Sequence, residues 1–432
     1  MNRALLIPLS IAVVLHVALA ILVEPRVEVD SEFYRTQAEA LVAHGASLDA
    51  AGQPETRYTP GYPLFLAVFL AGGLGYTGAI VAQHLIWIAL VVAAMWLVRR
   101  ASGSTLAAGA AGLITALDLP GIQSSISLLS ETLAAATLVG AVCCTLAAMR
   151  AVQPARSLQW AVAGGILAGA TALVRPIAIL VGVPLAIGIL IGGGRRWRIA
   201  ATAALLAAFA VLPVFWIMRN ARETGVATLS SLAGINLLHF RAAGTLAIRD
   251  PGGIDANLAR RRDELEARAC RDLEARFQRP CATLSWAERS GGYAAVAWPI
   301  LLADPVATGH QAARALGMIV LGGSANLLAE LTGISEGVAR LLALAYTVPL
   351  AVLALLGTSY WWQRDRAFAC LVLLVIVYMF GMAFGAEAYS RFRVPVIALY
   401  AILCGGGVAT VRDSVLSEHA TPSASRASRR SD

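Results

Sequence analysis

Lysine is absent from this 432-residue sequence, so all 34 basic residues are arginine. Charged residues of both signs make up only 14% of the chain, against about 25% in ordinary soluble domains. A chain with so little charge cannot cover a water-exposed surface of this size, which excludes a freely soluble globular protein. Because the net charge of +8 comes from arginines clustered between apolar runs, it does not indicate a nucleic-acid partner.

Cysteine is scarce, and no Cys/His spacing in the sequence is typical of a structural zinc site. Cys270 and Cys281 lie in the long hydrophilic part of the chain, which we expect in an oxidising compartment, and we expect them to form a disulfide. The other four lie in apolar runs, where they act as small apolar residues: Cys143, Cys144, Cys370 and Cys404.

Long apolar runs are what the sequence has in excess, with 58% hydrophobic residues and a mean hydropathy of +0.70. A helix that spans a bilayer needs about 20 mostly apolar residues, and by that rule the chain holds about 10 spans, within a range of about 9 to 13. We therefore expect an all-α polytopic membrane protein, a bundle of transmembrane helices with juxtamembrane helices and a small outer domain. The runs lie near 4–23, 76–98, 104–120, 124–149, 157–174, 176–194, 199–218, 337–359, 367–385 and 393–411.

The arginines between the runs predict the topology. If Arg3 lies inside and each run crosses once, every arginine cluster falls on the inner side, as the positive-inside rule requires. Both termini are then cytoplasmic. The alanine-rich, lysine-free composition is typical of a bacterial chain, and hence of the inner (plasma) membrane. The clusters are Arg99 and Arg100, Arg150 and Arg156, Arg195, Arg196 and Arg198, Arg364 and Arg366, and Arg412.

The first run has an alternative interpretation, a cleavable signal peptide ending at Ala18-Leu19-Ala20. The apolar stretch continues past that point to Val23, which favours a retained span. Both interpretations leave the residues that follow on the outer side.

Four parts follow from the positions of the runs. Residues 255–279 are rich in Arg, Glu and Ala and predict a solvated helix. Residues 306–331 are apolar but broken by glycine and serine, which indicates a re-entrant or juxtamembrane element. The parts are an N-terminal transmembrane module, 1–218, with an outer loop at 24–61; an outer segment, 219–335; C-terminal transmembrane helices, 336–412; and a disordered cytoplasmic tail, 413–432.

Polar residues near the membrane are informative because they are costly to keep there. In the predicted topology they gather toward the outer face, while the span interiors hold almost nothing ionisable. Glu131 is notable because it lies within an apolar run, where unpaired carboxylates are rare. The candidate residues are Asp30, Glu32, Tyr34, Arg57, Tyr58, Gln83, His84, Glu131, Arg175, Arg219, Asn220, Glu387, Arg391 and Arg393.

Each candidate also has a structural interpretation. Asp30 is equally suited to be a solvated acid or the cap of a helix that begins near it. Arg175 could extend from a helix end to the headgroups, as arginines commonly do. Arg391 and Arg393 could anchor a helix at the interface, and His84 fits a packed polar residue better than a ligand.

At these residues the chain resembles the C-type (GT-C) glycosyltransferases that use polyprenyl-phosphate sugars, and most nearly their protein O-mannosyltransferase and lipid A aminoarabinose transferase branch. Asp30-Ser31-Glu32-Phe33-Tyr34 is similar to the family's acidic motif in the first outer loop. Arg57-Tyr58-Thr59-Pro60 resembles its proline-containing return to the membrane, and Leu129-Ser130-Glu131-Thr132 resembles its second acidic motif. Ser31 stands where close relatives often carry a second acid.

Further matches follow in order through most of the chain. Leu173-Val174-Arg175-Pro176 resembles a family hairpin between spans, and Met218-Arg219-Asn220 resembles the start of the outer domain. The segment from Glu387 to Pro395 is similar to the one before the family's final spans. Residues 240–335 show little resemblance, so the acceptor stays open.

The resemblance implies inverting transfer of a hexose or pentose from a polyprenyl-phosphate carrier to a lipid, protein or glycan acceptor on the non-cytoplasmic face. Asp30 is the expected base. Glu131 would position a substrate or share a divalent cation with Asp30, and no other cofactor is implied. Arginine suits the phosphate because its guanidinium binds two phosphate oxygens at once. Besides the bilayer, the implied partners are this donor and its acceptor, with no nucleic acid.

Two other functions remain alternatives. A lipid or small-molecule transporter or flippase often has repeated halves and ionisable residues near the bilayer midplane. The sequence has no detectable repeat, and its charges gather at one face. A scaffold subunit without a site is opposed by Glu131 in its apolar run.

Overall fold

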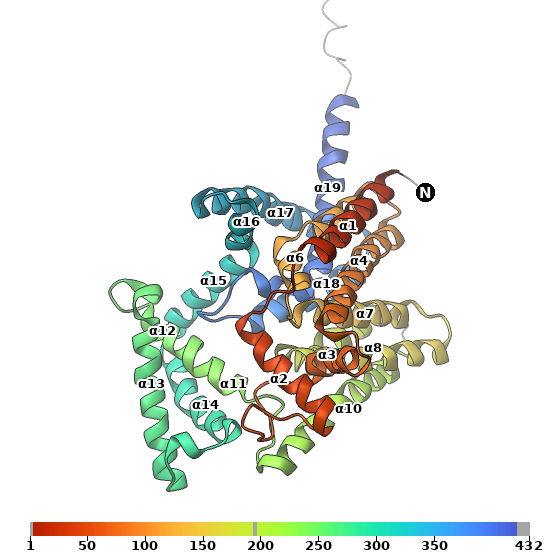
Figure 1. Ribbon diagram of the computed structural model, residues 1–432. Helices are drawn as coiled ribbons and strands as arrows, with labels where there is room; N and C mark the ends of the chain where they lie inside the picture. The colour runs from red at the N-terminus through yellow and green to blue at the C-terminus, as the bar shows by residue number, and fades with distance from the viewer. Residues whose placement is uncertain (1–2, 193–196, 421–432) are drawn as a thin grey trace, which may run out of the picture.

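The computed structural model describes residues 3–192 and 197–420, and within these residues it forms helices and no strand beyond two isolated bridges (Figure 1). Arg195, Arg196 and the tail beyond Ala420 lie outside the described residues. The helices are α1 (Arg3–Leu22), α2 (Val29–His44), α3 (Gly61–Ala71), α4 (Gly75–Ser102), α5 (Thr105–Ala116), α6 (Leu119–Ile126), α7 (Glu131–Arg150), α8 (Pro154–Val174), η1 (Pro176–Ala178), α9 (Gly182–Gly192), α10 (Arg198–Thr224), α11 (Leu232–Asn236), η2 (Leu237–Ala242), α12 (Ala243–Ala247), α13 (Gly253–Phe277), η3 (Cys281–Thr283), α14 (Trp286–Ala303), α15 (Pro305–Leu321), α16 (Ala325–Thr332), α17 (Glu336–Arg364), α18 (Arg366–Met382), η4 (Ser390–Val396) and α19 (Ile397–Ala420).

The expected polytopic helical fold is confirmed. In the described part of the chain, 8 helical segments are long and apolar enough to cross a membrane, or up to 9 if the bent pair of α5 and α6 forms one span. The predicted spans 176–194 and 367–385 correspond to shorter apolar helices, Pro176–Gly192 and Arg366–Met382. Conversely, Pro305–Thr332 has the length and composition of a membrane span. For this region, 306–331, the sequence predicted a re-entrant or juxtamembrane element because of its glycines and serine.

The region predicted as spans 104–120 and 124–149 is divided differently. The chain bends by 50° between α5 and α6, and α7 begins only at Glu131. Asp118 explains the break, because its carboxylate accepts a hydrogen bond from the amide of Gly121 at 3.0 Å and so starts a new helix. Pro120 in the first turn of α6 reinforces that start. Glu131 is therefore the first residue of the candidate span α7, which begins later than the predicted run at 124–149.

The predicted inner loops lie side by side. Arg150 pairs with Asp365 at 2.7 Å, and the Arg364 guanidinium donates to the carbonyl of Ser102 at 3.3 Å. These contacts bring together the ends of α4, α7 and α17.

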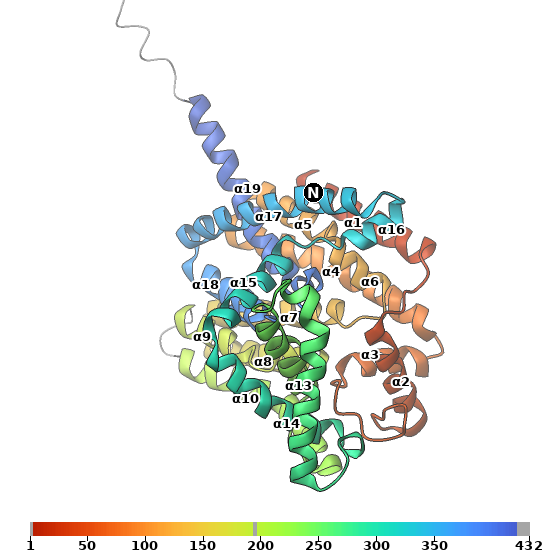
Figure 2. The same ribbon diagram turned by 90° about the vertical axis from the view of Figure 1, so that its left-hand side faces the viewer.

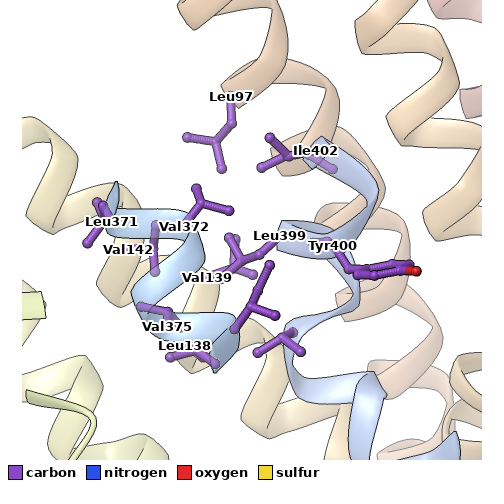
Figure 3. Close-up of a cluster of buried hydrophobic side chains, with 14 of the residues drawn as sticks. Leu97, Leu138, Val139, Val142, Leu371, Val372, Val375, Leu399, Tyr400 and Ile402 are labelled. Carbon is purple, nitrogen blue, oxygen red and sulfur yellow. The ribbon is translucent and has the colours of Figure 1, made fainter. Parts of the chain in front are cut away.

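The core lies where α4, α7, α18 and α19 meet, and its side chains are shown in Figure 3. Small residues bring other helices still closer. A Cβ at Gly357 of α17 would lie 1.7 Å from the carbonyl oxygen of Leu403, so only glycine permits this approach of α17 to α19. The side chains of the core cluster include Leu97, Leu138, Val139, Val142, Leu371, Val372, Val375, Leu399, Tyr400 and Ile402.

Within the segment 219–335, residues from η2, α12, α13, η3 and α14 form a hydrophobic cluster of their own. Figures 1 and 2 both show α13 and α14 together at one side of the molecule, away from the end of α19. A disulfide joins Cys270 to Cys281, with their Cα atoms 5.3 Å apart, and thereby fixes the end of α13 against η3. The solvated helix predicted at 255–279 corresponds to α13, whose few buried residues face α14 and η2.

The final helix is longer than expected. The predicted tail begins at 413, but α19 continues as a helix to Ala420. The part of the tail at 413–420 is therefore helical.

Candidate active site

The first acid of the site is held at the start of α2. Glu28 and Ser31 cap this helix reciprocally, and the Ser31 hydroxyl also donates to the carbonyl of Leu128 at 3.0 Å. Arg26, just before α2, bonds to the end of α6, since its amide donates to the carbonyl of Ile126 at 2.9 Å. These hydrogen bonds place Asp30, on the first turn of α2, beside the start of α7.

Glu131 is the first residue of α7 and is fully buried, with 0% of its side chain exposed. A carboxylate at a helix N-terminus is stabilised by the free amides there. Its charge is further compensated by ion pairs with Arg175, which ends α8, and with Arg391 of η4. The end of α8 and η4 thus each bring an arginine to the carboxylate at the start of α7.

Arg391 joins the two acids. Its guanidinium forms ion pairs with Asp30 through one nitrogen and with Glu131 through another. Asp30 keeps 27% of its side chain exposed, whereas Arg391 keeps 15% and Arg175 11%. The four-residue cluster of Asp30, Glu131, Arg175 and Arg391 therefore runs from a buried acid to an accessible one.

Two tyrosines lie beside this cluster. The hydroxyl of Tyr58 donates to Asp30 Oδ1 at 3.4 Å, and the Tyr34 hydroxyl lies 3.3 Å from Ser130 Oγ. Burial, and next the negative charge of Asp30, raise the pKa of Tyr58 above its usual value. Tyr58 is therefore neutral at physiological pH and can donate a hydrogen bond there.

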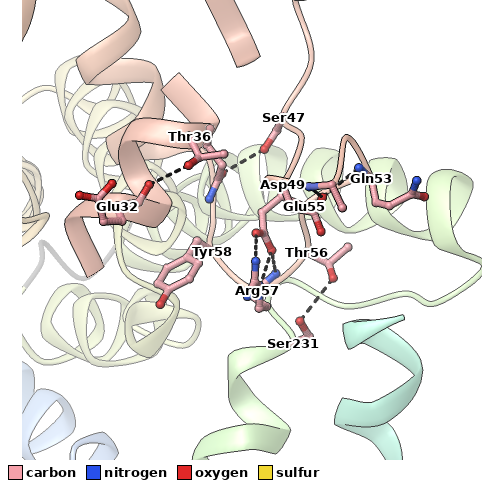
Figure 4. Close-up of polar contacts among 12 residues, drawn as sticks. Glu32, Thr36, Ser47, Asp49, Gln53, Glu55, Thr56, Arg57, Tyr58 and Ser231 are labelled. Atoms are coloured by element: carbon pink, nitrogen blue, oxygen red, sulfur yellow. Dashed lines mark hydrogen bonds and ion pairs between the residues drawn. The ribbon is translucent and has the colours of Figure 1, made fainter. Parts of the chain in front are cut away.

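A second group of candidates anchors the outer loop and does not join the cluster (Figure 4). Arg57 pairs with the buried Glu55 at 2.8 Å, and its guanidinium lies over the rings of Phe33 and Trp286. Arg219 donates to the carbonyls of Ser47 and Glu55 at 2.8 and 2.9 Å. These bonds tie the loop between α2 and α3 to α10 and the outer segment.

Asn220 continues this anchoring, since its amide donates to the carbonyl of Thr228 at 2.8 Å. Glu32 lies on the exposed side of α2, beside Arg35 at 3.3 Å.

The remaining polar candidates are occupied inside the bundle. His84 of α4 faces His16 of α1, with their Nδ1 atoms 2.9 Å apart. Gln83 accepts from the hydroxyl of Tyr62 at 2.9 Å. The contact of His84 agrees with its interpretation as a packed polar residue, and Gln83 is hydrogen-bonded inside the bundle as well.

Arg393 and Glu387 flank Arg391 but lie away from the two acids. Arg393 is buried and pairs with Asp118 at 2.9 Å. Glu387 lies in the loop before η4, where the positive charge of Arg241 of η2 favours its ionised form. Burial raises the pKa of Glu387 to about 7.

Sequence reasoning did not single out Ser130, Asp118 or Arg241. Ser130 borders the site, 3.4 Å from Arg175 Nη1, and its place beside Glu131 was the available signal. Asp118 sits before a proline in an apolar stretch, which is the signature of a helix start. Arg241 gave no local signal, because its contacts are with Met382 and Phe384, far away in the sequence.

The two acids were also candidates for a shared divalent cation. In this arrangement the Arg391 guanidinium contacts both carboxylates and already supplies their positive charge. Within residues 3–192 and 197–420 no group of three or more His, Cys, Asp or Glu side chains could hold a metal. As placed, the two acids share the Arg391 guanidinium between them.

Chemically, the cluster combines an accessible carboxylate with two guanidiniums. Such a carboxylate can accept a proton, and guanidiniums bind phosphate or carboxylate groups by charge-assisted hydrogen bonds.

Comparison with known proteins gives structural matches alone. No protein-family model and no curated protein matches the sequence. The structure is similar to the archaeal oligosaccharyltransferase AglB from Archaeoglobus fulgidus in complex with an inhibitory peptide and a dolichol-phosphate. The TM-score is 0.56 at 14% identity, over 97% of this chain and 51% of that chain. The apo form of the Archaeoglobus fulgidus oligosaccharyltransferase gives a TM-score of 0.55 at 16% identity, over 96% and 51%.

This chain thus spans about half the length of these oligosaccharyltransferase chains. ArnT from Cupriavidus metallidurans is covered over 81% of its length at 15% identity, but its TM-score of 0.44 is too low to support an argument. The matches at TM-scores above 0.5, together with the helical spans, define the architecture. The chain is a multi-pass membrane protein with the fold of the C-type glycosyltransferases.

Proposed function

We propose that this protein is an inverting membrane glycosyltransferase that moves a sugar from a polyprenyl-phosphate carrier to an acceptor hydroxyl. The observation that carries the proposal is the cluster itself, in which a partly exposed acid and a buried acid share one guanidinium. The fold and a solved relative bound to dolichol-phosphate support a lipid-phosphate donor.

Asp30 is the proposed base because it is the accessible acid of the cluster. In the reaction the acceptor hydroxyl loses its proton to the Asp30 carboxylate while its oxygen attacks the anomeric carbon. The bond between that carbon and the phosphate oxygen breaks, and the lipid phosphate leaves with the bonding electrons. General-base assistance of this kind contributes roughly 10²- to 10⁴-fold to the rate.

Arg391 and Arg175 are the proposed phosphate ligands. Both guanidiniums are part of the cluster and both keep some exposure, unlike Glu131. A phosphate that competes for Arg391 would also weaken the hold of Arg391 on Asp30 and so increase the basicity of that carboxylate. Glu131 then keeps the two guanidiniums in place through its buried charge.

The location of the reaction follows from the predicted topology. The cluster lies on elements that the arginine pattern assigns to the outer side. The same pattern assigns both termini to the cytoplasm. We propose that the protein works in the inner membrane of a bacterium with its site facing outward. The sugar, and whether the acceptor is a lipid, a protein or a glycan, are left to experiment.

The test uses the full chain in nanodiscs with a panel of radiolabelled polyprenyl-phosphate sugars, each offered with lipid, peptide and glycan acceptors. Release of the lipid phosphate is measured for wild type and for Asp30→Asn, with lipid-phosphate binding followed in parallel. We expect Asp30→Asn to lower turnover by roughly 10²- to 10⁴-fold while binding is retained. If the folded wild type binds the lipids but releases phosphate from none, transport or scaffolding would replace the transferase.

A further inference from the structure

A buried ion pair lies beside the proposed site without belonging to it. Arg393 and Asp118 each have only 1% of the side chain exposed, and their Nη2 and Oδ1 atoms are 2.9 Å apart. Burying two charges costs more free energy than such a pair usually returns, so a buried pair is weak evidence for stability alone. The pair is therefore better explained by the elements that it connects, α15 on one side and α6 on the other.

On one side Arg393 binds the end of α15. Its Nη1 donates to the carbonyls of Ile319, Val320 and Gly322 at 3.0, 2.8 and 3.1 Å. The last carbonyls of a helix have no partner within the helix, and a cation there also interacts favourably with the helix dipole. Arg393 thus fixes η4 against α15.

On the other side the pair reaches the element that positions Asp30. Asp118 binds Arg393 through Oδ1 and caps α6 through Oδ2, which accepts from the amide of Gly121 at 3.0 Å. At its far end α6 leads into the segment that bonds to Arg26 and Ser31, at the start of α2. A continuous path of hydrogen bonds and one short helix therefore links Arg393 to the helix of Asp30.

Arg391 and Arg393 lie two residues apart on the same 3₁₀ helix. Fixing Arg393 therefore restricts where Arg391 can point, while Asp118 restricts the element on which Asp30 depends. We propose that Arg393 is a positioning residue which, with Asp118, sets the register between the segment of Arg391 and the segment of Asp30. This inference rests on the proposed function for its effect on turnover, but its structural part can be measured without turnover.

The decisive variant is Asp118→Asn. Asparagine caps helices as well as aspartate, so the start of α6 is preserved while Arg393 loses its counter-charge. Asp365→Asn is a matched control, because Asp365 also caps a helix, α18, and pairs with an arginine, Arg150 at 2.7 Å, at the end of α7.

Two readouts are needed. Hydrogen–deuterium exchange of the full chain in nanodiscs reports the protection of 119–129 and 388–396. Turnover gives kcat and KM for the lipid donor. We expect Asp118→Asn to raise exchange in both segments and to lower kcat by about 10²-fold, the scale of a 1 Å misplacement, with KM little changed. Asp365→Asn should change neither segment. The neutral double variant Asp118→Asn/Arg393→Gln covers the case in which the single variant fails to fold, and should also raise exchange at 388–396.

The outcomes separate the two proposals. Raised exchange with lower kcat supports positioning. Unchanged exchange, or raised exchange with wild-type kcat, overturns positioning and leaves the transferase standing. Raised exchange in a protein whose wild type transfers no sugar supports the link between the segments and overturns the proposed function.

Discussion

Replacing Glu131 by glutamine tests the charge balance of the site most directly. The cluster holds two negative charges, on Asp30 and Glu131, and two positive charges, on Arg175 and Arg391, so its net charge is zero. Glu131→Gln leaves a net charge of +1 in a region where the lost carboxylate was fully buried. We expect this variant to be folded but clearly less stable than the wild type.

The magnitude follows from that burial. Removing one partner of a buried ion pair costs about 3–5 kcal/mol, because the remaining charge is left uncompensated. By contrast, Glu336 forms an exposed pair with Arg340 within α17 at 3.1 Å, and such pairs contribute about 0–1 kcal/mol. Glu336→Gln is therefore the matched control, with the same chemical change and a loss of at most about 1 kcal/mol.

The assay is equilibrium unfolding in mixed micelles, followed by the fluorescence of the nine tryptophans. The double variant Glu131→Gln/Arg175→Gln restores a net charge of zero. It should be more stable than the sum of the single variants implies, by roughly 0.5–3 kcal/mol of coupling. Additive losses, or a Glu131→Gln variant as stable as Glu336→Gln, would refute the assignment of Glu131 as the buried centre of the cluster.

Other consequences can be measured separately. Because burial raises the pKa of Glu387 from 4.5 to about 7, the folded state retains a proton that the unfolded state releases. Stability should therefore fall as the pH rises from about 4.5 to about 7, by up to about 3 kcal/mol, and Glu387→Gln should remove this slope in thermal unfolding scans from pH 5 to 8. A slope that is unchanged in Glu387→Gln would assign the pH dependence to another group. Reduction of the disulfide between Cys270 and Cys281, or replacement of both by serine, should cost about 2–4 kcal/mol locally. The loss should appear as faster hydrogen exchange at the end of α13, and unchanged exchange there would contradict a stabilising role.

The sequence predicted the class of fold well, and composition explains why. A chain with 14% charged residues and long apolar runs has few stable forms other than a helical membrane bundle, because backbone groups in lipid must bond within their own segment. The limits of the helices were harder to predict. The break between α5 and α6 depends on one capping aspartate, and 306–331 has the apolar content of a span despite its glycines.

The candidate site could be predicted in part. Asp30, Glu131, Arg175 and Arg391 were singled out because charge near apolar runs is costly, and the structure brings these four together. The same reasoning could not separate Arg391 from Arg393, which are two residues apart and chemically identical. One pairs with the two acids and the other with Asp118 and the end of α15.

The sequence by itself thus determined that the chain is a polytopic helical membrane protein and that its ionisable residues gather at a few positions. Those properties depend on composition and spacing, which are local along the chain. Only the tertiary structure decided which charges meet, because an ion pair such as that of Asp30 with Arg391 joins α2, near the start of the chain, to η4, just before the last helix, α19. Whether a buried charge is compensated depends on distances across the fold, and these are set by the packing of all the helices together.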